Sequence, residues 1–466
     1  MSESNLDDIP GEKLAWYAGI DRYQWLVLTV CSLGWIFDIF EGQIFVASMR
    51  EAMPSLTDDP GQVDVLNRWA MASFLVGGAL GGVVFGWLAD RIGRSKTLAL
   101  TIVVYSLFTF ITAFAQAPWQ FILLRFVVAL GTGGEWAVGA AFVAEVFPKR
   151  SRPWMGSIFH GSSVVGTFLA VFAGAYVIGN PDLGEWAWRW GFALGALPAI
   201  LVLWIRWSMK EPERWVEAHA QELESDEHEA PRLLALFMGP MLRRTLFGLA
   251  LSTTGIATFW GVHIFGKSVT LHRAEQQYLV EAGVPVDSTG ENRKNALEPY
   301  QQAIKNAEML GMFVTTLGGG LGLLSFGAIS TWLGRRGAFV FYYLGGFVAT
   351  LIVFLWVYHS GNLPLILVTL PVFGFLTLGM HAGYAVYFPE LYPTRLRSSG
   401  SGFCFNVGRF TAAPILLITA LFQRPINDGG WGMSNEEVAT WMSVLFLVGA
   451  VISLFGPETR GQELPD

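Results

Sequence analysis

The sequence is short of charged residues and of cysteine. Asp, Glu, Lys and Arg make up 14% of its 466 residues, whereas a soluble domain carries about 25%. This shortage argues against a soluble enzyme and against a disordered chain. The two cysteines, Cys31 and Cys404, both lie inside apolar runs. No disulfide framework of the kind found in small secreted proteins is therefore indicated.

The chain also lacks an excess of basic residues. Its 30 Lys and Arg are outnumbered by 37 Asp and Glu, which gives a formal net charge of −7. A nucleic-acid-binding surface needs clustered positive charge, so we expect no nucleic-acid partner. Residues 1–23 show no basic stretch leading into a short apolar core, so we do not expect a cleaved signal peptide.

Long apolar runs are abundant. Hydrophobic residues make up 53% of the chain, and the mean hydropathy is +0.44. A helix needs about 20 mostly apolar residues to cross a bilayer. We expect twelve such spans, at residues 24–46, 68–89, 96–116, 120–146, 154–178, 188–207, 245–265, 307–329, 338–358, 364–387, 399–422 and 438–455.

Basic residues between the spans predict the orientation in the membrane. With both termini placed in the cytoplasm, 19 of the 30 Lys and Arg fall in inside segments and nine in outside segments. Arg125 and Arg409 lie inside spans. Cytoplasmic segments carry the excess of basic residues. We therefore predict a multi-pass protein of the cell (inner or plasma) membrane with both termini in the cytoplasm.

The two halves of the chain repeat one another. EVFPKRSR (145–152) aligns with ELYPTRLR (390–397), and the same offset places Pro212-Glu213 on Pro457-Glu458. A parallel duplication of six spans predicts an all-α membrane protein of two six-helix bundles related by a pseudo-twofold axis. The expected parts are a cytoplasmic segment (1–23), a bundle (24–207), a cytoplasmic linker (208–244), a second bundle with an external loop (245–455, loop 266–306) and a cytoplasmic tail (456–466).

Several of these segments resemble a known family. GWLADRIGR (86–94) looks like the signature loop of the major facilitator superfamily. RFVVALGTGGE, PERW, ELYPTRLR and PETRG resemble the group of sugar porters, organic-ion transporters and a vesicle protein family. Residues 16–42 resemble sialate:proton and aromatic-acid:proton symporters, although Asp38-Ile39-Phe40-Glu41 replaces their D-G-F-D-like motif. The resemblance implies alternating access to a site between the bundles.

Carboxylates within spans are candidates for proton coupling, because a charge there is costly. Asp38 and Glu41 share one helix face through their i, i+3 spacing, and Glu135 lies deeper in the fourth span. The resemblance implies that Arg125 faces the first-span acid, so we expect a Glu41–Arg125 pair that protonation releases. The alternatives are an ion pair that only fixes helix packing and, for Glu135, a hydrogen bond to helix backbone.

Arg409 is the candidate for substrate binding. It lies about ten residues into its span, near the membrane midplane, and a guanidinium matches a carboxylate bidentately. FNVGRF (405–410) also resembles organic-anion transporters. The alternative is that Arg409 pairs with Glu135 or with another acid. Further candidates are the aromatic residues Trp136, Trp260, Tyr384 and Tyr387, the polar residue Asn406, and His160, His263 and His381, which suit proton relays but more often only pack.

A third set of residues is predicted to form a latch. The resemblance implies that the loop at Gly86, Asp90, Arg91 and Arg94 closes the cytoplasmic side. The expected partners are Glu145, Arg150, Arg152, Glu390, Arg395 and Arg397. The second half has Thr331 and Trp332 in place of Asp90 and Arg91, so we expect the latch to rest on the first half. The alternative is that the arginines only set the membrane topology.

Together these features predict proton-coupled symport of a small organic acid, sialate-like, aromatic or a monocarboxylate. The alternatives are a sugar porter and a non-transporting membrane sensor. The seventh span has no Gln or Asn, which counts against a sugar. We expect no enzyme activity, no cofactor other than the coupling proton, no metal site and a monomer in the bilayer. GVHIFGKS (261–268) fits a P-loop pattern, but it ends a span and follows no strand.

Overall fold

The computed structural model describes residues 15–178, 180–195, 197, 204, 208–224, 232–288, 290–426 and 429–465. Over these residues the chain forms helices and connecting turns, with no strand. Ten of the described helical runs are long and apolar enough to cross a membrane. The predicted all-helical architecture is therefore present, and half of the predicted span 188–207 falls outside the described residues.

The first half of the chain begins with a capped helix. The Asp21 side chain accepts from the Gln24 backbone N–H while the Gln24 side chain accepts from the Asp21 N–H, which satisfies backbone donors that a helix start leaves free. The helices are α1 (Arg22–Leu56), α2 (Val63–Ile92), α3 (Arg94–Thr112), α4 (Pro118–Val146), α5 (Arg152–Gly161), α6 (Ser163–Ala173), η3 (Gly174–Ile178), η4 (Pro181–Trp186) and α7 (Ala187–Leu194), with η2 (Pro60–Gln62) before α2.

The second half is helical to a similar extent. Short helices α9 (Glu213–Glu224) and α10 (Arg232–Ala235) precede it. The others are α11 (Gly239–Gly261), η5 (His263–Gly266), α12 (Lys267–Glu281), α13 (Gly290–Leu297), η6 (Glu298–Tyr300), α14 (Gln301–Ile352), η7 (Val353–Val357), α15 (Tyr358–Ser360), α16 (Leu363–Leu378), η8 (Gly379–His381), α17 (Ala382–Leu391), η9 (Thr394–Leu396), α18 (Arg397–Gln423), α19 (Asn435–Met442) and α20 (Val444–Leu454).

Two segments differ from the expected span pattern. The predicted external loop 266–306 is mostly helical, since α12 continues the seventh span, and two ion pairs, Lys267–Glu308 and Glu275–Arg293, join its helices. The single helix α14 includes a sharp turn at Gly334, whose φ of 81° and ψ of 172° lie outside helical geometry. A positive φ is readily adopted by glycine alone, so the 71-residue run Gly290–Ser360 reverses at this residue.

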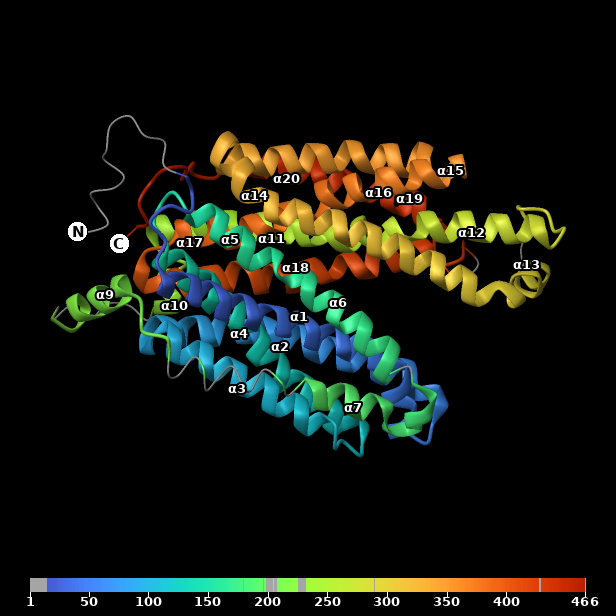
Figure 1. Cartoon of the computed structure of the whole chain (residues 1–466), viewed down its shortest axis with the longest axis horizontal. Helices are drawn as coiled ribbons and strands as arrows, with labels where there is room; N and C mark the ends of the chain where they lie inside the picture. Colours follow the sequence, from blue (N-terminus) through green and yellow to red (C-terminus); the bar gives the residue numbers. More distant parts are fainter. Residues whose placement is uncertain are drawn as a thin grey trace.

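The helices form two sets that meet along a central interface. Figure 1 shows α1–α7 below and α14, α16 and α20 above, closest at the end where α1 begins and α20 ends. We call this the termini end, and the opposite end, where α12 and α13 project, the far end. Helix α2 packs against α18, and α5 packs against α14. The two sets of helices diverge toward the far end (Figure 1).

Glycines allow the two halves to approach closely at the termini end. A Cβ on Gly86 of α2 would lie 2.7 Å from the Ser398 carbonyl oxygen of α18. Across the pseudo-twofold axis, a Cβ on Gly327 of α14 would lie 2.7 Å from the Pro153 carbonyl oxygen of α5. Small residues are what permit such backbone contact between membrane helices. The termini end is therefore tightly closed.

Candidate functional site

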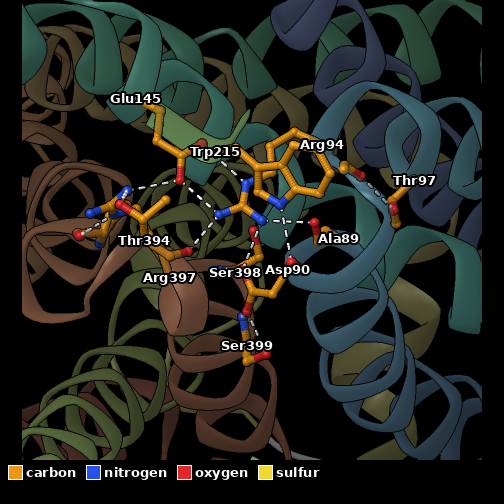
Figure 2. Close-up of polar contacts among 12 residues, drawn as sticks. Ala89, Asp90, Arg94, Thr97, Glu145, Trp215, Thr394, Arg397, Ser398 and Ser399 are labelled. Atoms are coloured by element: carbon orange, nitrogen blue, oxygen red, sulfur yellow. Dashed lines mark hydrogen bonds and ion pairs between the residues drawn. The ribbon is translucent and has the colours of Figure 1, made fainter. Parts of the chain in front are cut away.

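Asp90 joins the two halves at the termini end. Its carboxylate accepts hydrogen bonds from the backbone N–H groups of Ser398 (3.1 Å) and Ser399 (2.8 Å) and from the Ser399 hydroxyl (2.6 Å) (Figure 2). These two N–H groups belong to the first turn of α18, where a helix favours a negative charge. Asp90 comes from the last turn of α2, so the contact holds α2 to the start of α18.

Arg94 and Arg397 share one carboxylate. Arg94 binds both oxygens of Glu145 (3.1 and 2.8 Å), and Arg397 binds Glu145 Oε1 at 2.8 Å. Arg94 also pairs with Asp90 at 2.9 Å and donates to the Thr394 carbonyl at 2.7 Å. Figure 2 shows Glu145 between the two guanidinium groups, one from each half. All the ionic side chains are buried, so the network stabilises the protein fully only while the two halves are in contact at this end.

The other residues predicted for the latch occupy different places. Arg152 is buried and donates to the Ala144 carbonyl at 3.0 Å, and Arg150 donates to the Ala18 carbonyl. Arg91 and Arg395 are exposed, and Arg91 stacks on Trp87 of its own helix. Neither Arg91 nor Arg395 is among the buried residues of the network that joins the halves.

The second half has a related but internal network. Arg335 binds both oxygens of Glu390 (2.9 and 2.7 Å), as Arg94 binds Glu145. Thr331 stands where Asp90 stands in the first half, and its hydroxyl donates to the Gly327 carbonyl of its own helix at 2.7 Å. Among the residues that the structure describes, the hydrogen bonds of Arg335, Glu390 and Thr331 stay within the second half. The structure thus has the asymmetry that the sequence predicted.

Two carboxylates cap helices at equivalent places in the two halves, although the sequence repeat does not align them with each other. Glu211 accepts from the N–H groups of Ser95 (3.1 Å) and Lys96 (3.2 Å) at the start of α3. Glu458 accepts in the same way from Arg335 (2.9 Å) and Arg336 (3.2 Å). The sequence alignment had matched Glu458 with residue 213. The structural equivalent lies two residues earlier, because the cap must reach the backbone that follows Gly93 (φ 111°).

Near the far end, Glu41 of α1 and Arg125 of α4 form a fully buried ion pair. Thr109 donates to the same Glu41 oxygen at 3.1 Å, and Arg125 donates to the Thr112 hydroxyl at 2.7 Å. The guanidinium also packs on aromatic rings, with its carbon 4.6 Å from the centroid of Phe192, a favourable cation–π geometry. The contact expected from the sequence is present, and neither charge lacks a partner.

Asp38 and Arg409 face one another from opposite halves. Each lies within Coulombic range of the other, and Asp38 also faces Glu41 and Glu135. Asp38 is 6% exposed, and its Oδ2 has no hydrogen-bond partner among the described residues. Within that part of the chain, Arg409 forms no ion pair as close as 4 Å. The alternative expected from the sequence is that Arg409 pairs with an acid. An acid, Asp38, lies in Coulombic range, but the two do not form a close ion pair.

Glu135 is a buried carboxyl without a cation in the described structure. Neither of its oxygens accepts a hydrogen bond from a described residue, and the Tyr105 hydroxyl faces it from outside hydrogen-bonding geometry. Its carboxyl lies against Gly34 of α1, where any Cβ would collide with it. An ionised carboxylate in such a place is costly. Binding of a proton would neutralise the Glu135 carboxylate and remove this cost.

Aromatic residues from both halves meet beside Arg409. The indole of Trp136 (α4) stacks on the ring of Phe405 (α18) with centroids 3.8 Å apart. The Arg409 guanidinium carbon lies 5.0 Å from the centroid of the same Phe405 ring. His160 meets this ring edge-on at 6.1 Å, and Tyr384 lies 5.9 Å from it. Sequence reasoning names every member of this cluster except Phe405, which appears there only as part of the segment FNVGRF.

Other predicted substrate-binding residues lie around this cluster without joining it. Asn406 donates to the Gly133 carbonyl at 2.9 Å and so holds α18 to α4. His263 bonds to the Thr377 hydroxyl at 2.7 Å within the second half, and Trp260 is 37% exposed beside Phe259. Tyr387 donates to the Pro457 carbonyl at the termini end. His381 packs edge-on to Tyr384 at 5.4 Å and is the nearest of them to the cluster.

A family model described as Major Facilitator Superfamily matches residues 45–416, which is most of the chain. The chain belongs to this superfamily. It is a multi-pass membrane transporter of the superfamily and not an enzyme. The solved proton:xylose symporter XylE of Escherichia coli, bound to 6-bromo-6-deoxy-D-glucose, has the same fold. The TM-score is 0.69 at 16% identity, covering 95% of this chain and 98% of XylE.

Curated relatives of this superfamily chain match nearly its whole length. A probable 4-methylmuconolactone transporter of Cupriavidus pinatubonensis is 28% identical, over 96% of this chain and 94% of the relative. The sialic acid transporter NanX of Escherichia coli is 26% identical, over 86% and 88%. A gallate transporter of Pseudomonas putida is 27% identical, over 84% of each chain.

Proposed function

We propose that this protein carries a small organic acid across the membrane together with a proton, with the cluster of Arg409, Phe405 and Trp136 as its substrate site. The observation that carries the proposal is the Arg409 guanidinium, which has no ion pair within 4 Å among the described residues and lies on an aromatic ring between the two halves. A carboxylate is the natural ligand of such a group. Relatives named for gallate and sialic acid support this ligand class.

We further propose that the chain crosses the membrane twelve times and functions as a monomer. Ten runs are long and apolar enough, the run Gly290–Ser360 supplies two passes by reversing at Gly334, and the predicted span 188–207 supplies the last. The excess of basic residues at the termini end supports placing that end in the cytoplasm. The network of Asp90, Arg94, Glu145 and Arg397 then closes the cytoplasmic end, so the structure represents the outward-facing state of the transport cycle.

Charge balance supports coupling to protons. The central region has three carboxyl groups, Asp38, Glu41 and Glu135, against two guanidinium groups, Arg125 and Arg409. Glu41 and Arg125 neutralise each other, which leaves Arg409 as the one remaining positive charge for Asp38, Glu135 and the substrate among these five groups. A substrate carboxylate that binds Arg409 withdraws its charge from Asp38. Before the substrate binds, one proton shared by Asp38 and Glu135 already makes this region neutral. The substrate carboxylate adds one negative charge, and a second proton, so that both Asp38 and Glu135 are protonated, restores neutrality. The acid therefore brings one further proton with it. This arrangement assigns the coupling to Asp38 and Glu135, while Glu41 stays paired.

Proteoliposomes test this proposal. Purified protein should accumulate a labelled aryl carboxylate when the outside is more acidic than the lumen, and it should not accumulate xylose. Arg409→Ala should abolish binding of the acid. The double variant Glu135→Gln/Asp38→Asn should abolish proton-driven accumulation but preserve exchange of labelled for unlabelled acid, because neutral amides retain the packing but cannot release a proton.

The matched control is Tyr105→Phe, which alters the neighbour of Glu135 without altering a charge. It should still accumulate the acid. Unchanged affinity for acids in Arg409→Ala would reject the anion site. Continued proton-driven accumulation in the double variant Glu135→Gln/Asp38→Asn would reject the coupling. Accumulation of xylose with no acid uptake would identify a sugar porter instead.

A further inference from the structure

His160 is held in one tautomer by its neighbour. The indole N–H of Trp136 donates to His160 Nδ1 at 3.0 Å. An indole nitrogen can only donate, so Nδ1 must be the accepting atom. A neutral imidazole that accepts at Nδ1 carries its proton on Nε2. His160 is therefore fixed as a hydrogen-bond donor through Nε2.

The ring of His160 is also fixed in position. It lies one residue before the end of α5, and the Trp35 indole N–H donates to its backbone carbonyl at 3.2 Å. Trp35 packs 5.6 Å from the imidazole, and the whole residue is 5% exposed. Nε2 nevertheless donates to no described residue. It is also not one of the fully buried polar side-chain atoms without a partner in the described part of the chain, so a ligand can reach it. The donor is thus rigid, nearly buried and unused.

The surroundings of His160 place this donor beside the anion site. The ring of Phe405 in α18 packs edge-on against the His160 imidazole, and the Arg409 guanidinium lies over the same Phe405 ring. The charged or titratable groups that face His160 are Arg409 from α18 and His381 from η8. Helices α1 and α4 contribute Trp35 and Trp136. Two donors of different kinds, one cationic and one neutral, therefore lie next to one aromatic platform.

We infer that His160 determines substrate specificity by donating its Nε2–H to a second acceptor on the transported acid. The acceptor is a hydroxyl, a carbonyl or a ring nitrogen, and the carboxylate binds Arg409. This inference rests on the proposed function and deepens it. A residue that only packed would need neither a fixed tautomer nor a free donor. A site built around a buried donor discriminates against analogues that leave the donor unpaired.

Matched ligand pairs provide the test. Purified protein in nanodiscs is titrated calorimetrically with benzoate, 3-hydroxybenzoate, 4-hydroxybenzoate and pyridine-3-carboxylate. We expect at least one acid with a second acceptor to bind about tenfold or more tightly than benzoate. In His160→Phe, which retains an aromatic ring but has no donor, the preference should disappear while the affinity for benzoate stays within about twofold.

Further variants keep the inference falsifiable if His160→Phe folds poorly. His160→Gln restores a donor and should recover part of the preference. Trp136→Phe keeps a ring on Phe405 but frees the tautomer, and should weaken the preference. The control His359→Phe changes an exposed histidine at the far end and should leave all affinities unchanged.

Two results would overturn the inference. The first is a wild-type protein that binds benzoate as tightly as every analogue with a second acceptor. The second is a His160→Phe variant that retains the full preference. Failure of the proposed function has a different signature. Arg409→Ala would then leave the binding of all four acids unchanged, whatever His160 contributes.

Discussion

Asp90 and Ser399 lie in opposite halves of the chain, and one Asp90 oxygen accepts both the backbone N–H and the hydroxyl of Ser399, at 2.8 and 2.6 Å. Their helices, α2 and α18, cross where Gly86 removes the side chain that would hold them apart. The carboxylate therefore caps a helix of the opposite half. The bond exists only while the termini end is closed, so its strength adds directly to the stability of that state.

Asp90→Ala should open the termini end. Hydrogen bonds to a charged group are each worth about 1.5–3 kcal/mol, so losing this cap should raise the population of the open state by at least tenfold. Spin labels on Ile92→Cys and Trp332→Cys, which lie in opposite halves near this end and are exposed, report the opening as a longer distance by pulsed electron resonance.

Thr331→Val is the matched control for the cap. Thr331 stands at the equivalent position of the second half, but its hydroxyl bonds to its own helix. The same pair of labels should therefore show the wild-type distance. If Asp90→Ala also kept that distance, the cap would have no part in closing this end.

Gly86→Ala should weaken the same closed state by a steric route. The added methyl would lie 2.7 Å from the Ser398 carbonyl oxygen, and a backbone atom cannot move aside without moving α18. Gly78→Ala on the same helix is the control, because its methyl would meet its nearest neighbour at 4.0 Å. We expect the labels to report opening for Gly86→Ala alone. Equal distances in the two alanine variants would contradict the close packing of α2 and α18.

The Glu41–Arg125 pair should behave as a unit in stability measurements. Removing one partner from a buried pair costs about 3–5 kcal/mol, because the other charge is left unpaired. Glu41→Gln should therefore lower the apparent melting temperature strongly. The double variant Glu41→Gln/Arg125→Met, which removes both charges, should recover much of the loss.

Transport by the double variant separates the structural role from a coupling role. Since the proposed proton carriers are Asp38 and Glu135, proton-driven accumulation should survive in the double variant. Its loss in a variant of restored stability would return the coupling to Glu41, as the sequence alone suggested. Fluorescence-detected melting at a fixed scan rate supplies the stability measurement.

Apolar length and the internal repeat predict most of the fold, because a bilayer imposes both. An intramembrane arginine needs an acid, and the resemblance to symporters implied that the acid is Glu41, so the Glu41–Arg125 contact could be predicted. Other relationships depend on tertiary packing that no local pattern records. Asp38 and Arg409 lie within Coulombic range of each other although 371 positions separate them, and Trp136 stacks on Phe405 from the opposite half. The helix α12 was missed because its polar sequence lacks the apolar length that marks a span.

The repeat alignment shows a further limit of sequence reasoning. Matching the dipeptides Pro212-Glu213 and Pro457-Glu458 is the simplest alignment of the two halves. The structure instead uses residue 211, since a helix cap is selected by the direction of two backbone N–H groups and not by a neighbouring proline. The repeat therefore marks the segment that supplies the cap, but it does not indicate which carboxylate of that segment does so.

This difference gives a stability prediction with a built-in control. Glu211 caps α3 through Ser95 and Lys96, whereas Glu213 is exposed. Loss of a helix cap costs about 0.5–2 kcal/mol, so Glu211→Ala should lower the apparent melting temperature and Glu213→Ala should not. Glu458→Ala should resemble Glu211→Ala, because it removes the equivalent cap from Arg335 and Arg336. A larger effect at Glu213 than at Glu211 would restore the alignment drawn from the sequence. Equal, small effects at Glu211 and Glu458 would mean that Gly93 and Gly334 hold these turns without help.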